Sequence, residues 1–541
     1  MSERTALRAP THDGAVVAEP PLREAGTALA SNRRRLQTHA DNHALLGRPW
    51  TDLRRQARQS AVAAALEYLG ENPKSEIRNP KSDTLLVAGH QPELFHPGVW
   101  VKNFALYGLA RAHHATSLNL VVDNDTVKTT ALRIPTPAAT EKDRPHARPI
   151  LYDRWTGETP YEEKTISDRE LFASFAERAG ALLRGWHYEP LLPSFWAEVL
   201  QQTERSPLLG ECFAAARRTF ERDWGCHNLE VPLSTLCRTE PFAWFACHQL
   251  AHLPRFHTLY NAIVADYRRS HGIRSRNHPV PDLAVEGDWL EAPFWGWRAG
   301  SVNPRRNRLF ARRHDDRIEL RAGDEAWPSL PWPQEGRAET AVKAWQALEG
   351  QGFKVRSRAL TTTLYARLFL ADLFIHGIGG GKYDELTDEL IRRFYECEPP
   401  IYIVLSATRW LPLPRAAVSV EDRRRLARAV RDVHFNPQRY LDETATSDNL
   451  AELAEQKQAW IARRAATVRE RRERFHMLRT LTEQLRHPLR PREDQLRQAL
   501  ARCERQLRAN AVLQRRDYSF CLFPENILRP FCTQFLGERP A

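Results

Sequence analysis

The chain has 541 residues, 42% of them hydrophobic, and 79 lysines and arginines against 67 acidic residues give a formal net charge of +12. A chain of this length buries more than one core, which excludes a small binding module and indicates roughly two to four domains. The charge is uneven, because residues 451–517 hold 17 basic and 9 acidic side chains. This local surplus indicates either a phosphate-rich partner or simply a solvated helix face.

The cysteines and the N-terminus bear on the compartment. Eight cysteines are scattered without a C-x-x-C pair, a pattern typical of reduced thiols rather than of a disulfide framework. Residues 1–26 have no apolar signal-peptide core, and no window of the chain approaches eighteen consecutive apolar residues. We therefore expect a cytoplasmic protein with no membrane partner.

The N-terminal part contains one strong helix signal. Residues 1–30 are rich in proline and alanine without periodicity, so we expect a loosely ordered arm. Residues 50–69 have an apolar stripe at helical spacing, with Thr51 as a candidate cap and Gly70 as a stop. The Asn-Pro-Lys-Ser repeat within residues 72–82 predicts a polar surface linker.

A strand–helix–strand pattern follows. Residues 84–88 form a short apolar run, residues 99–112 have helical spacing, and residues 118–122 form a second apolar run ending at Asp123 and Asp125. This order is typical of the start of a doubly wound α/β domain, in which ligands bind outside the carboxyl ends of the strands.

The turn after the first of these strands carries several polar side chains. Gly89 permits a sharp turn, and His90, Gln91, His96 and Lys102 are placed to direct donors at an anion before a helix N-terminus. The alternative is structural: the histidines satisfy loop carbonyls and the lysine extends to solvent. The two acids after the second strand either orient a substrate amine or a metal, or cap the following segment.

The middle of the chain is rich in aromatic residues and proline. Phe294, Trp295 and Trp297 suit either a strand facing a substrate or an ordinary core. His248 and His252 are one helical turn apart, but a third clear ligand is missing, so we predict no metal site.

A second glycine-rich run occupies residues 377–381, between His376 and Lys382, and is predicted to be a loop at a helix N-terminus. Its four glycines would let backbone N–H groups approach phosphate oxygens, although the run is not a Walker A motif. A flexible turn is the alternative interpretation. The apolar run at 401–405 then completes a second β-α-β unit.

Two long helical arms are predicted near the C-terminus. An imperfect heptad stripe begins near residue 450 and resumes after the double-proline segment 487–491, which predicts an antiparallel helical hairpin. The tail should dock back on the core. The chain is thus divided into an N-terminal arm, helix and linker, a first core half, an aromatic-rich insertion, a second core half, a helical hairpin and a tail: residues 1–83, 84–160, 161–350, 351–443, 444–517 and 518–541.

Residues 89–95, Gly-His-Gln-Pro-Glu-Leu-Phe, carry a resemblance to a known family. Together with the later features of the chain, they resemble the bacillithiol-biosynthesis cysteine-adding enzyme family, whose loop reads G-Q-Q-P-G-L-F. His90 and Glu93 differ from that pattern. The glycines at 379 and 380 match part of the family's G-G-P-G-E segment, and Arg358 is matched to an arginine there.

That resemblance implies a fold and an activity. The family has a Rossmann-like core related to nucleotidyltransferases and class I aminoacyl-tRNA synthetases, inserted segments, and a coiled coil that mediates dimerisation. We therefore expect an α/β protein with a Rossmann-like core, an inserted α+β segment and a C-terminal antiparallel coiled-coil hairpin. The implied activity is a ligase that joins cysteine to an amino-sugar acceptor, glucosaminyl malate, in a homodimer. No cofactor is assigned, with ATP and ADP as candidates.

The site prediction combines these motifs. We expect His90, Lys102 and Asp125 to be catalytic, with histidine binding an anionic group, lysine neutralising developing charge and aspartate orienting an amine. The predicted substrate-binding residues are Gly89, Gln91, His96, Asn103, Asp123, Arg358, His376, Gly377, Gly379, Gly380 and Lys382.

Two alternatives remain. A His-Gln-Pro segment followed by Pro-Gly and a lysine is similar to the opening of the shorter WbqC-like family, which would imply a transferase. The basic hairpin also suits a non-catalytic nucleotide- or nucleic-acid-binding protein. Because the hairpin has an apolar seam, we interpret its surplus charge as the outer face of an oligomerisation arm and expect no nucleic-acid partner.

Overall fold

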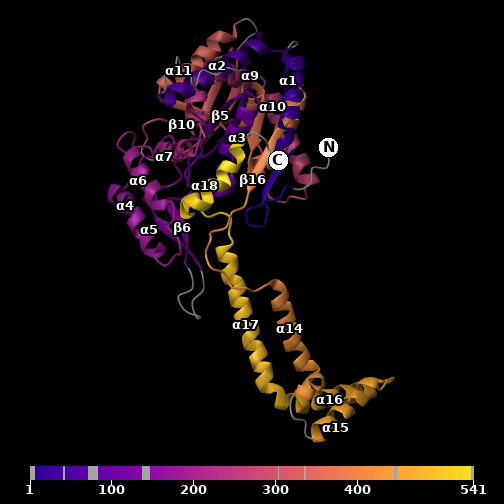
Figure 1. Cartoon of the computed structure of the whole chain (residues 1–541). Helices are drawn as coiled ribbons and strands as arrows, with labels where there is room; N and C mark the ends of the chain where they lie inside the picture. The colour runs from indigo at the N-terminus through magenta and orange to yellow at the C-terminus, as the bar shows by residue number, and fades with distance from the viewer. Residues whose placement is uncertain are drawn as a thin grey trace. The chain divides into compact units, whose positions relative to one another are not determined.

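The fold comes from a computed structural model, which describes residues 7–40, 43–70, 83–136, 146–301, 304–333, 337–443 and 448–537. The chain is a mixed α/β protein with a long C-terminal helical region, and it divides into two compact units (Figure 1). The α/β unit comprises residues 1–134, 149–411 and 516–541. The helical unit comprises residues 135–148 and 412–515.

A six-stranded, mostly parallel sheet forms the centre of the α/β unit. Its strands are β1 (Val16–Glu19), β4 (Leu85–His90), β5 (Thr116–Val121), β8 (Leu229–Pro232), β15 (Leu373–His376) and β16 (Tyr402–Ala407). They lie in the order β1-β16-β15-β4-β5-β8, and only β1 is antiparallel to its neighbour. From the adjacent strands β4 and β15, the sheet therefore extends in opposite directions.

Helices cover both faces of this sheet, as the alternation of buried strand residues requires. Leu86 and Ala88 face a core that contains α1 (Ala25–Ala40) and α3 (Pro97–Ala112). Leu85 and Val87 face the larger core, to which α2 (Trp50–Tyr68), α9 (Glu240–Ala251), α10 (Leu253–Ser270) and α13 (Ile378–Arg393) contribute.

The predicted strand–helix–strand segment is confirmed, with changes at its edges. β4 continues through Gly89 and His90, which therefore end a strand rather than form a turn. The strong helix at 50–68 is also confirmed and ends before Gly70, whose φ is +64°. Thr51 does not cap it, because the helix begins at Trp50 after Pro49.

The N-terminal arm prediction is wrong for the described residues. Residues 16–19 form β1, which adds an edge to the sheet, and residues 25–40 form α1. Asn32 fixes α1 to the sheet: its side chain donates to the carbonyls of Asp372 and Ile401, both at 2.8 Å. Tertiary pairing supplies the order that the local sequence pattern does not reveal. The predicted linker at 72–82 lies outside the described residues.

A second, antiparallel sheet lies mostly within the segment predicted as an insertion, residues 161–350, but takes its last strand, residues 353–357, from the predicted second core half. It contains β10 (Trp289–Arg298), β11 (Asn307–His314), β12 (Arg317–Ala322), β13 (Glu325–Pro331) and β14 (Phe353–Ser357), with β9 (Val285–Glu286) beside β10. The same segment also supplies β8 to the central sheet, so it is not separate from the core.

The remaining elements complete the α/β unit. Its strands β2 (Ala44–Leu45) and β3 (Arg48–Pro49) form a small hairpin. The other helices are α4 (Arg169–Ala173), α5 (Phe175–Leu183), α6 (Leu192–Gln202), α7 (Leu209–Asp223), α8 (Leu233–Leu236), α11 (Ala338–Gly350), α12 (Ala359–Tyr365) and α18 (Glu525–Thr533). The strands β6 (Ala131–Thr136) and β7 (His146–Leu151) form a separate two-stranded pair.

The helices of the helical unit do not pair as the predicted hairpin requires. It contains α14 (Val420–Phe435), α15 (Asp448–Ala462), α16 (Val468–Arg486) and α17 (Arg490–Leu513). The neighbouring pairs are α14 with α17 and α15 with α16 (Figure 1). The double-proline segment does not reverse the chain, because its prolines occupy first-turn positions, where proline is tolerated. The unit therefore begins earlier than the predicted boundary at residue 444.

The C-terminal tail docks on the α/β core, as predicted. The Phe520 N–H donates to the Phe95 carbonyl at 2.9 Å, and its ring centroid lies 4.3 Å from that of Trp100. All eight cysteines are buried and free, as their spacing predicts. Among the described helices, none combines the length and apolar character that a membrane crossing requires.

Candidate active site

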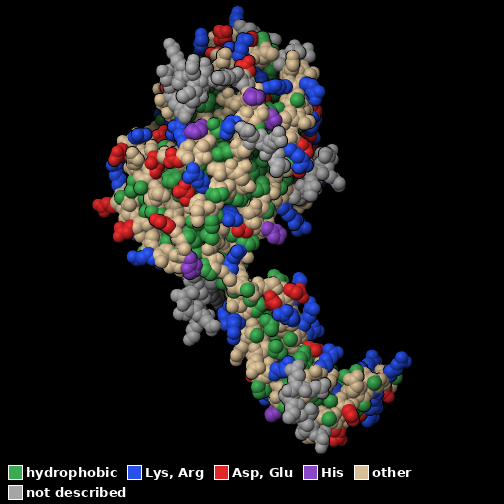
Figure 2. Space-filling view, viewed as in Figure 1, with side chains coloured by type: hydrophobic (Ala, Val, Ile, Leu, Met, Phe, Trp, Pro, Cys, Tyr) green, Lys and Arg blue, Asp and Glu red, His purple; other side chains and the backbone are tan. Residues whose placement is uncertain are grey.

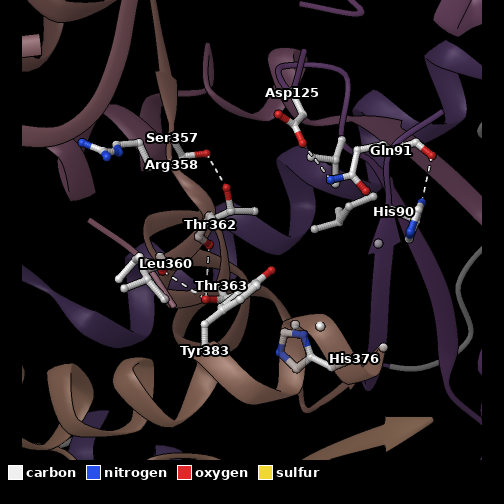
Figure 3. A pocket seen from close by; sticks show the side chains of 18 of the residues that line it. His90, Gln91, Asp125, Ser357, Arg358, Leu360, Thr362, Thr363, His376 and Tyr383 are labelled. Carbon is white, nitrogen blue, oxygen red and sulfur yellow. Dashed lines mark hydrogen bonds between the residues drawn. The ribbon is translucent and has the colours of Figure 1, made fainter. Parts of the chain in front are cut away.

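A pocket of about 670 Å³ lies at the carboxyl ends of the central strands (Figure 3). It opens beside β4 and β15, from which the sheet extends in opposite directions. Open α/β sheets bind ligands at this kind of position. Of the predicted site residues, those that line it are Gly89, His90, Gln91, His96, Lys102, Asp125, Arg358, His376, Gly377, Gly379 and Gly380.

Two helix N-termini meet at one end of the pocket. α3 begins at Pro97 after His96, and α13 begins at Ile378 directly after Gly377. The first intrahelical bond at α13 is donated by the Gly381 N–H to the Gly377 carbonyl at 2.9 Å. The preceding N–H groups of that helix therefore have no partner from within the helix, and together with the helix dipole they favour an anion.

Lys102 brings a full positive charge to the same end. Its side chain is buried, with 2% exposure, and its Nζ donates to the Gly89 carbonyl at 3.0 Å. A Cβ placed on Gly377 would lie 3.9 Å from Nζ, so the ammonium is close to the start of α13. Among the described residues, no carboxylate pairs with it. Burial lowers the pKa of Lys102 to about 8, so at neutral pH it is a poorly compensated buried cation.

The two histidines at this end are neutral groups rather than cations. Burial, with the nearby Lys102 charge, lowers the pKa of His90 to about 3. Burial, with the Arg516 charge, lowers the pKa of His96 to about 4. The His96 Nδ1 is buried, and no described residue hydrogen-bonds to it. These imidazoles therefore offer hydrogen bonds to a ligand, and Lys102 supplies the charge that the sequence analysis assigned partly to histidine.

Asp125 lies on another side of the pocket, where Gln91 holds it. The Gln91 Nε2 donates to Asp125 Oδ2 at 2.8 Å (Figure 3). Arg306 Nη2 lies 3.0 Å from Asp125 Oδ1. The Arg306 guanidinium also lies over the ring of Trp295, 4.8 Å from its centroid. Arg358 covers the same ring at 4.3 Å.

The aromatic segment is divided between the core and the pocket wall, and its role toward a substrate stays a prediction. Phe294 and Trp297 are buried, whereas Trp295 lines the pocket. Apolar side chains continue this wall, with Tyr260 and Leu283 among the lining residues. The pocket thus has a cationic end and an aromatic, apolar wall.

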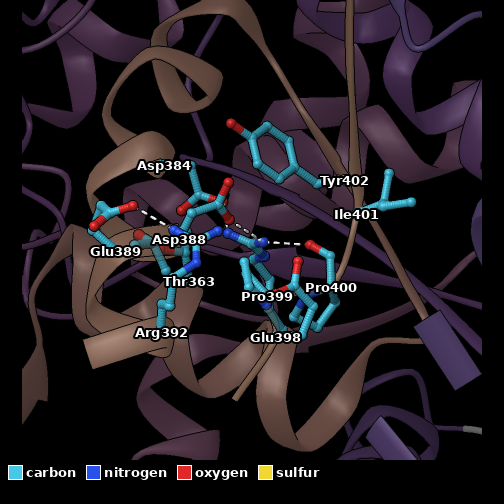
Figure 4. A network of polar contacts seen from close by, with 12 residues as sticks. Thr363, Asp384, Asp388, Glu389, Arg392, Glu398, Pro399, Pro400, Ile401 and Tyr402 are labelled. Atoms are coloured by element: carbon cyan, nitrogen blue, oxygen red, sulfur yellow. Dashed lines mark hydrogen bonds and ion pairs between the residues drawn. The ribbon is translucent and has the colours of Figure 1, made fainter. Parts of the chain in front are cut away.

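His376 ends β15 and is held by a buried acid. Its Nε2 lies 2.9 Å from Asp384 Oδ2, and Asp384 accepts a hydrogen bond of 2.6 Å from Arg367 Nη1. Arg367 also donates to Asp388 and to the Pro400 carbonyl, which completes the polar network of Figure 4. Each of these three central side chains, His376, Asp384 and Arg367, is at least 95% buried.

Three predicted site residues do not line the pocket. Asn103 lies on α3 facing away from it and donates to Glu221 Oε1 at 2.7 Å. Asp123 accepts from the Ser234 N–H at 2.9 Å and from its hydroxyl, so this acid holds the start of α8. Lys382 is exposed on α13, and its carbonyl accepts from Tyr267.

The glycine run is helical, which corrects its description as a loop. Only Gly377 joins β15 to α13, and Gly379, Gly380 and Gly381 form the first turn of the helix. A Cβ on Gly381 would lie 2.4 Å from Val404 Cγ2, whereas one on Gly379 would meet nothing within 4 Å. Close packing of the helix start therefore explains part of the glycine content.

Several lining residues were missed by the sequence analysis. They are on segments without a motif, such as Arg306 and Arg516, or just after the glycine run, as Tyr383 is. Tyr383 follows Gly379 by four positions, so a helical interpretation of the run would have put both on one face. The Tyr383 hydroxyl extends into the pocket in Figure 3.

The histidine pair in the middle of the chain, His248 and His252, packs against neighbouring aromatic rings. The ring centroids of His248 and His252 are 4.5 Å apart, and His248 also contacts Phe394 and Tyr395. Within the described ranges, no three His, Cys, Asp or Glu residues are grouped as a metal site.

Comparison with known proteins gives no assignment. No family model matches the chain, and no curated protein matches it.

Proposed function

We propose that the chain is a ligase that joins an amino acid, such as cysteine, to an amine-bearing acceptor of the amino-sugar type. One observation carries the proposal: Lys102, without a carboxylate partner among the described residues, lies beside the N-termini of α3 and α13 in a pocket that also contains Asp125. This end favours a phosphate or carboxylate group. Asp125 is placed to orient an amine in the same pocket.

The strand order supports a Rossmann-like core. Numbered along the chain, the five parallel strands lie in the order 3-2-1-4-5, the order of such sheets. The resemblance of residues 89–95 to the cysteine-adding family agrees with this core and with a long helical segment. A related transferase of the WbqC-like type is the alternative, since it would use the same pocket.

ATP or ADP is a candidate ligand on chemical grounds. Phosphates suit Lys102 and the first turn of α13, and the wall containing Tyr260, Leu283 and Trp295 suits an apolar or aromatic moiety. Such a nucleotide would supply an activated phosphate. The chain's own residues would bind the charge and orient the acceptor.

The helical unit supports a proposal of homodimerisation. Val468 and Phe475 on α16 are 60% and 61% exposed, and Phe435 on α14 is 58% exposed. Figure 2 shows apolar side chains among the basic ones on this unit. Exposed apolar groups of this kind are typical of protein contacts.

A ligand panel tests the proposed function. Wild type, Lys102→Ala and the exposed-lysine control Lys382→Ala would be heated with ATP, ADP, cysteine and sugar phosphates, and the shift in Tm recorded. We expect at least one anionic ligand to stabilise wild type and Lys382→Ala but not Lys102→Ala. Product formation from cysteine and glucosaminyl malate, with and without ATP, would then be followed by mass spectrometry. Equal stabilisation of all three proteins would contradict the proposed site.

A further inference from the structure

Within the described part of the chain, the imidazole of His376 is hydrogen-bonded through one nitrogen only. It ends β15 and lines the pocket, and its Nε2 lies 2.9 Å from Asp384 Oδ2 on α13. The Asp384 side chain is fully buried, and that of His376 is 5% exposed. A buried acid at this distance fixes both the orientation and the tautomer of a histidine.

Arg367 keeps the acid in its charged form. Burial by itself would raise the pKa of Asp384, but the Arg367 charge, with the hydrogen bond from His376, holds it below its usual value. The Arg367 guanidinium is in turn fixed by Asp388, at 2.5 Å. Because ionised Asp384 can only accept a hydrogen bond, the Nε2 of a neutral His376 must carry the proton and its Nδ1 the lone pair.

The surroundings of Nδ1 leave this lone pair available. A Cβ on Gly380 would lie 2.6 Å from Nδ1, so any side chain there would crowd the atom. Among the described residues, no group hydrogen-bonds to it, and it is not a sealed buried atom. Gly380 lines the pocket as well, so Nδ1 lies at the pocket wall. The glycine and the buried acid together present one basic nitrogen to a ligand.

We propose that His376 is the proton acceptor of this pocket, and that Asp384 and Arg367 are positioning residues for it. The inference rests on the proposed function, because it deepens the role of the same site. An N–H bond of the ammonium group on the amino-sugar-type substrate breaks as an Nδ1–H bond of His376 forms. The electron pair of the broken bond stays on the substrate nitrogen, which becomes a nucleophile. The positive charge of the resulting imidazolium faces the Asp384 carboxylate. The proton then passes to water.

Nitrogen NMR on protein labelled with ¹⁵N-histidine tests the tautomer without any substrate. The His376 signal is assigned by its loss in His376→Gln. If that variant does not fold, Phe374→Leu assigns it instead, since the two rings are 4.4 Å apart and their ring-current shift would change. We expect the neutral imidazole to carry its proton on Nε2 and not on Nδ1, and a mixture of tautomers in Asp384→Asn. A wild-type signal with the proton on Nδ1 would overturn the proposal.

Comparing the effects of substitutions on kcat and on ligand affinity tests the role of His376 as the proton acceptor. In the ligase assay, His376→Gln should lower kcat by about 100-fold or more, as expected for loss of a general base. The affinity for inorganic pyrophosphate, measured by calorimetry, should stay within about twofold of wild type, whereas Lys102→Met should weaken it. An unchanged kcat would overturn the role of His376. Failure of wild type to bind pyrophosphate or to form product would instead contradict the proposed function, with the tautomer result still standing.

Discussion

The two strand-to-helix junctions that border the pocket are built in different ways. Between β4 and α3 the chain uses residues 91–96, and Lys102 on α3 adds a buried charge. Between β15 and α13 it uses Gly377 alone, and this side adds backbone N–H groups and an imidazole held by Asp384. The first junction supplies a buried charge with no carboxylate partner among the described residues, and the second supplies backbone N–H groups and buried side chains that are paired with one another. Each side can therefore be altered separately.

The largest expected effect is on the packing of the first junction. A Cβ on Gly98 would lie 1.9 Å from the Ala407 carbonyl oxygen, which is backbone and cannot rotate away. Gly98→Ala should therefore lower the free energy of unfolding by about 3 kcal/mol, at the upper end for overpacking. At the second junction, a Cβ on Gly379 would meet no atom within 4 Å. Gly379→Ala should therefore raise the free energy of unfolding by about 0.5–1 kcal/mol, because alanine has the higher helix propensity. Denaturant unfolding measures both, and equal destabilisation would contradict the contrast.

Next in size is the stability cost of the buried lysine. The folded-state pKa of Lys102, about 8, lies below its ordinary value of 10.5. The penalty is therefore fully present below pH 8 and is relieved as the pH rises from about 8 to 10.5. Lys102→Met fills the same space without charge, so it should raise the free energy of unfolding at pH 7 by about 2 kcal/mol. Chemical denaturation at pH 7 and pH 10 checks this, and the gain should shrink at the higher pH. A loss of stability at pH 7 would mean that the ammonium has a stabilising partner.

The lowered pKa of Lys102 should also make the binding of an anionic ligand depend on pH. An anion bound beside Lys102 favours its protonated form, so the affinity for pyrophosphate should fall as the pH rises above about 8. The decline should approach tenfold per pH unit within the interval between the free and the bound pKa values. Calorimetric titrations from pH 7 to pH 9.5 measure it, with Lys382→Met as the matched control that keeps the same slope. A flat profile would remove Lys102 from the site.

The smallest effect concerns His96. Its pKa of about 4 lies below the ordinary 6.5, so the unfolded chain binds a proton first as the pH falls. Its contribution to stability is therefore complete above pH 6.5 and is lost between about 6.5 and 4. Between pH 7 and pH 5, the free energy of unfolding should therefore fall by about 1 kcal/mol less in His96→Gln than in wild type. Urea unfolding at pH 7 and pH 5 measures the difference, and identical pH dependence in both proteins would contradict it.

Much of the fold could be predicted because it depends on local patterns. The strands at 85–90 and 116–121 and the helices at 50–68 and 97–112 follow from apolar periodicity and stop signals. The order of α1 and β1 could not be predicted, because it comes from pairing with β16 far along the chain. The pairing of α14 with α17 was missed for the same reason: a heptad stripe does not identify its partner.

The site was predictable where a motif coincides with a strand end. His90 ends β4, Lys102 lies in the second turn of α3 and Asp125 follows β5, and all three line the pocket. Asn103 was misplaced because adjacent helix positions point about 100° apart, so the neighbour of a lining residue turns away. Tyr383 was missed because the glycine run was interpreted as a loop, which has no fixed periodicity.

The central claim is that Lys102 and the start of α13 form one anion site. Isothermal titration of inorganic pyrophosphate into wild type, Lys102→Met and Lys382→Met at pH 7 tests it most directly, since the two lysines are close in sequence to the two junctions but only one lines the pocket. We predict binding to wild type, an affinity at least about tenfold weaker in Lys102→Met, and no change in Lys382→Met. Unchanged affinity in Lys102→Met, or a loss confined to Lys382→Met, would contradict the account.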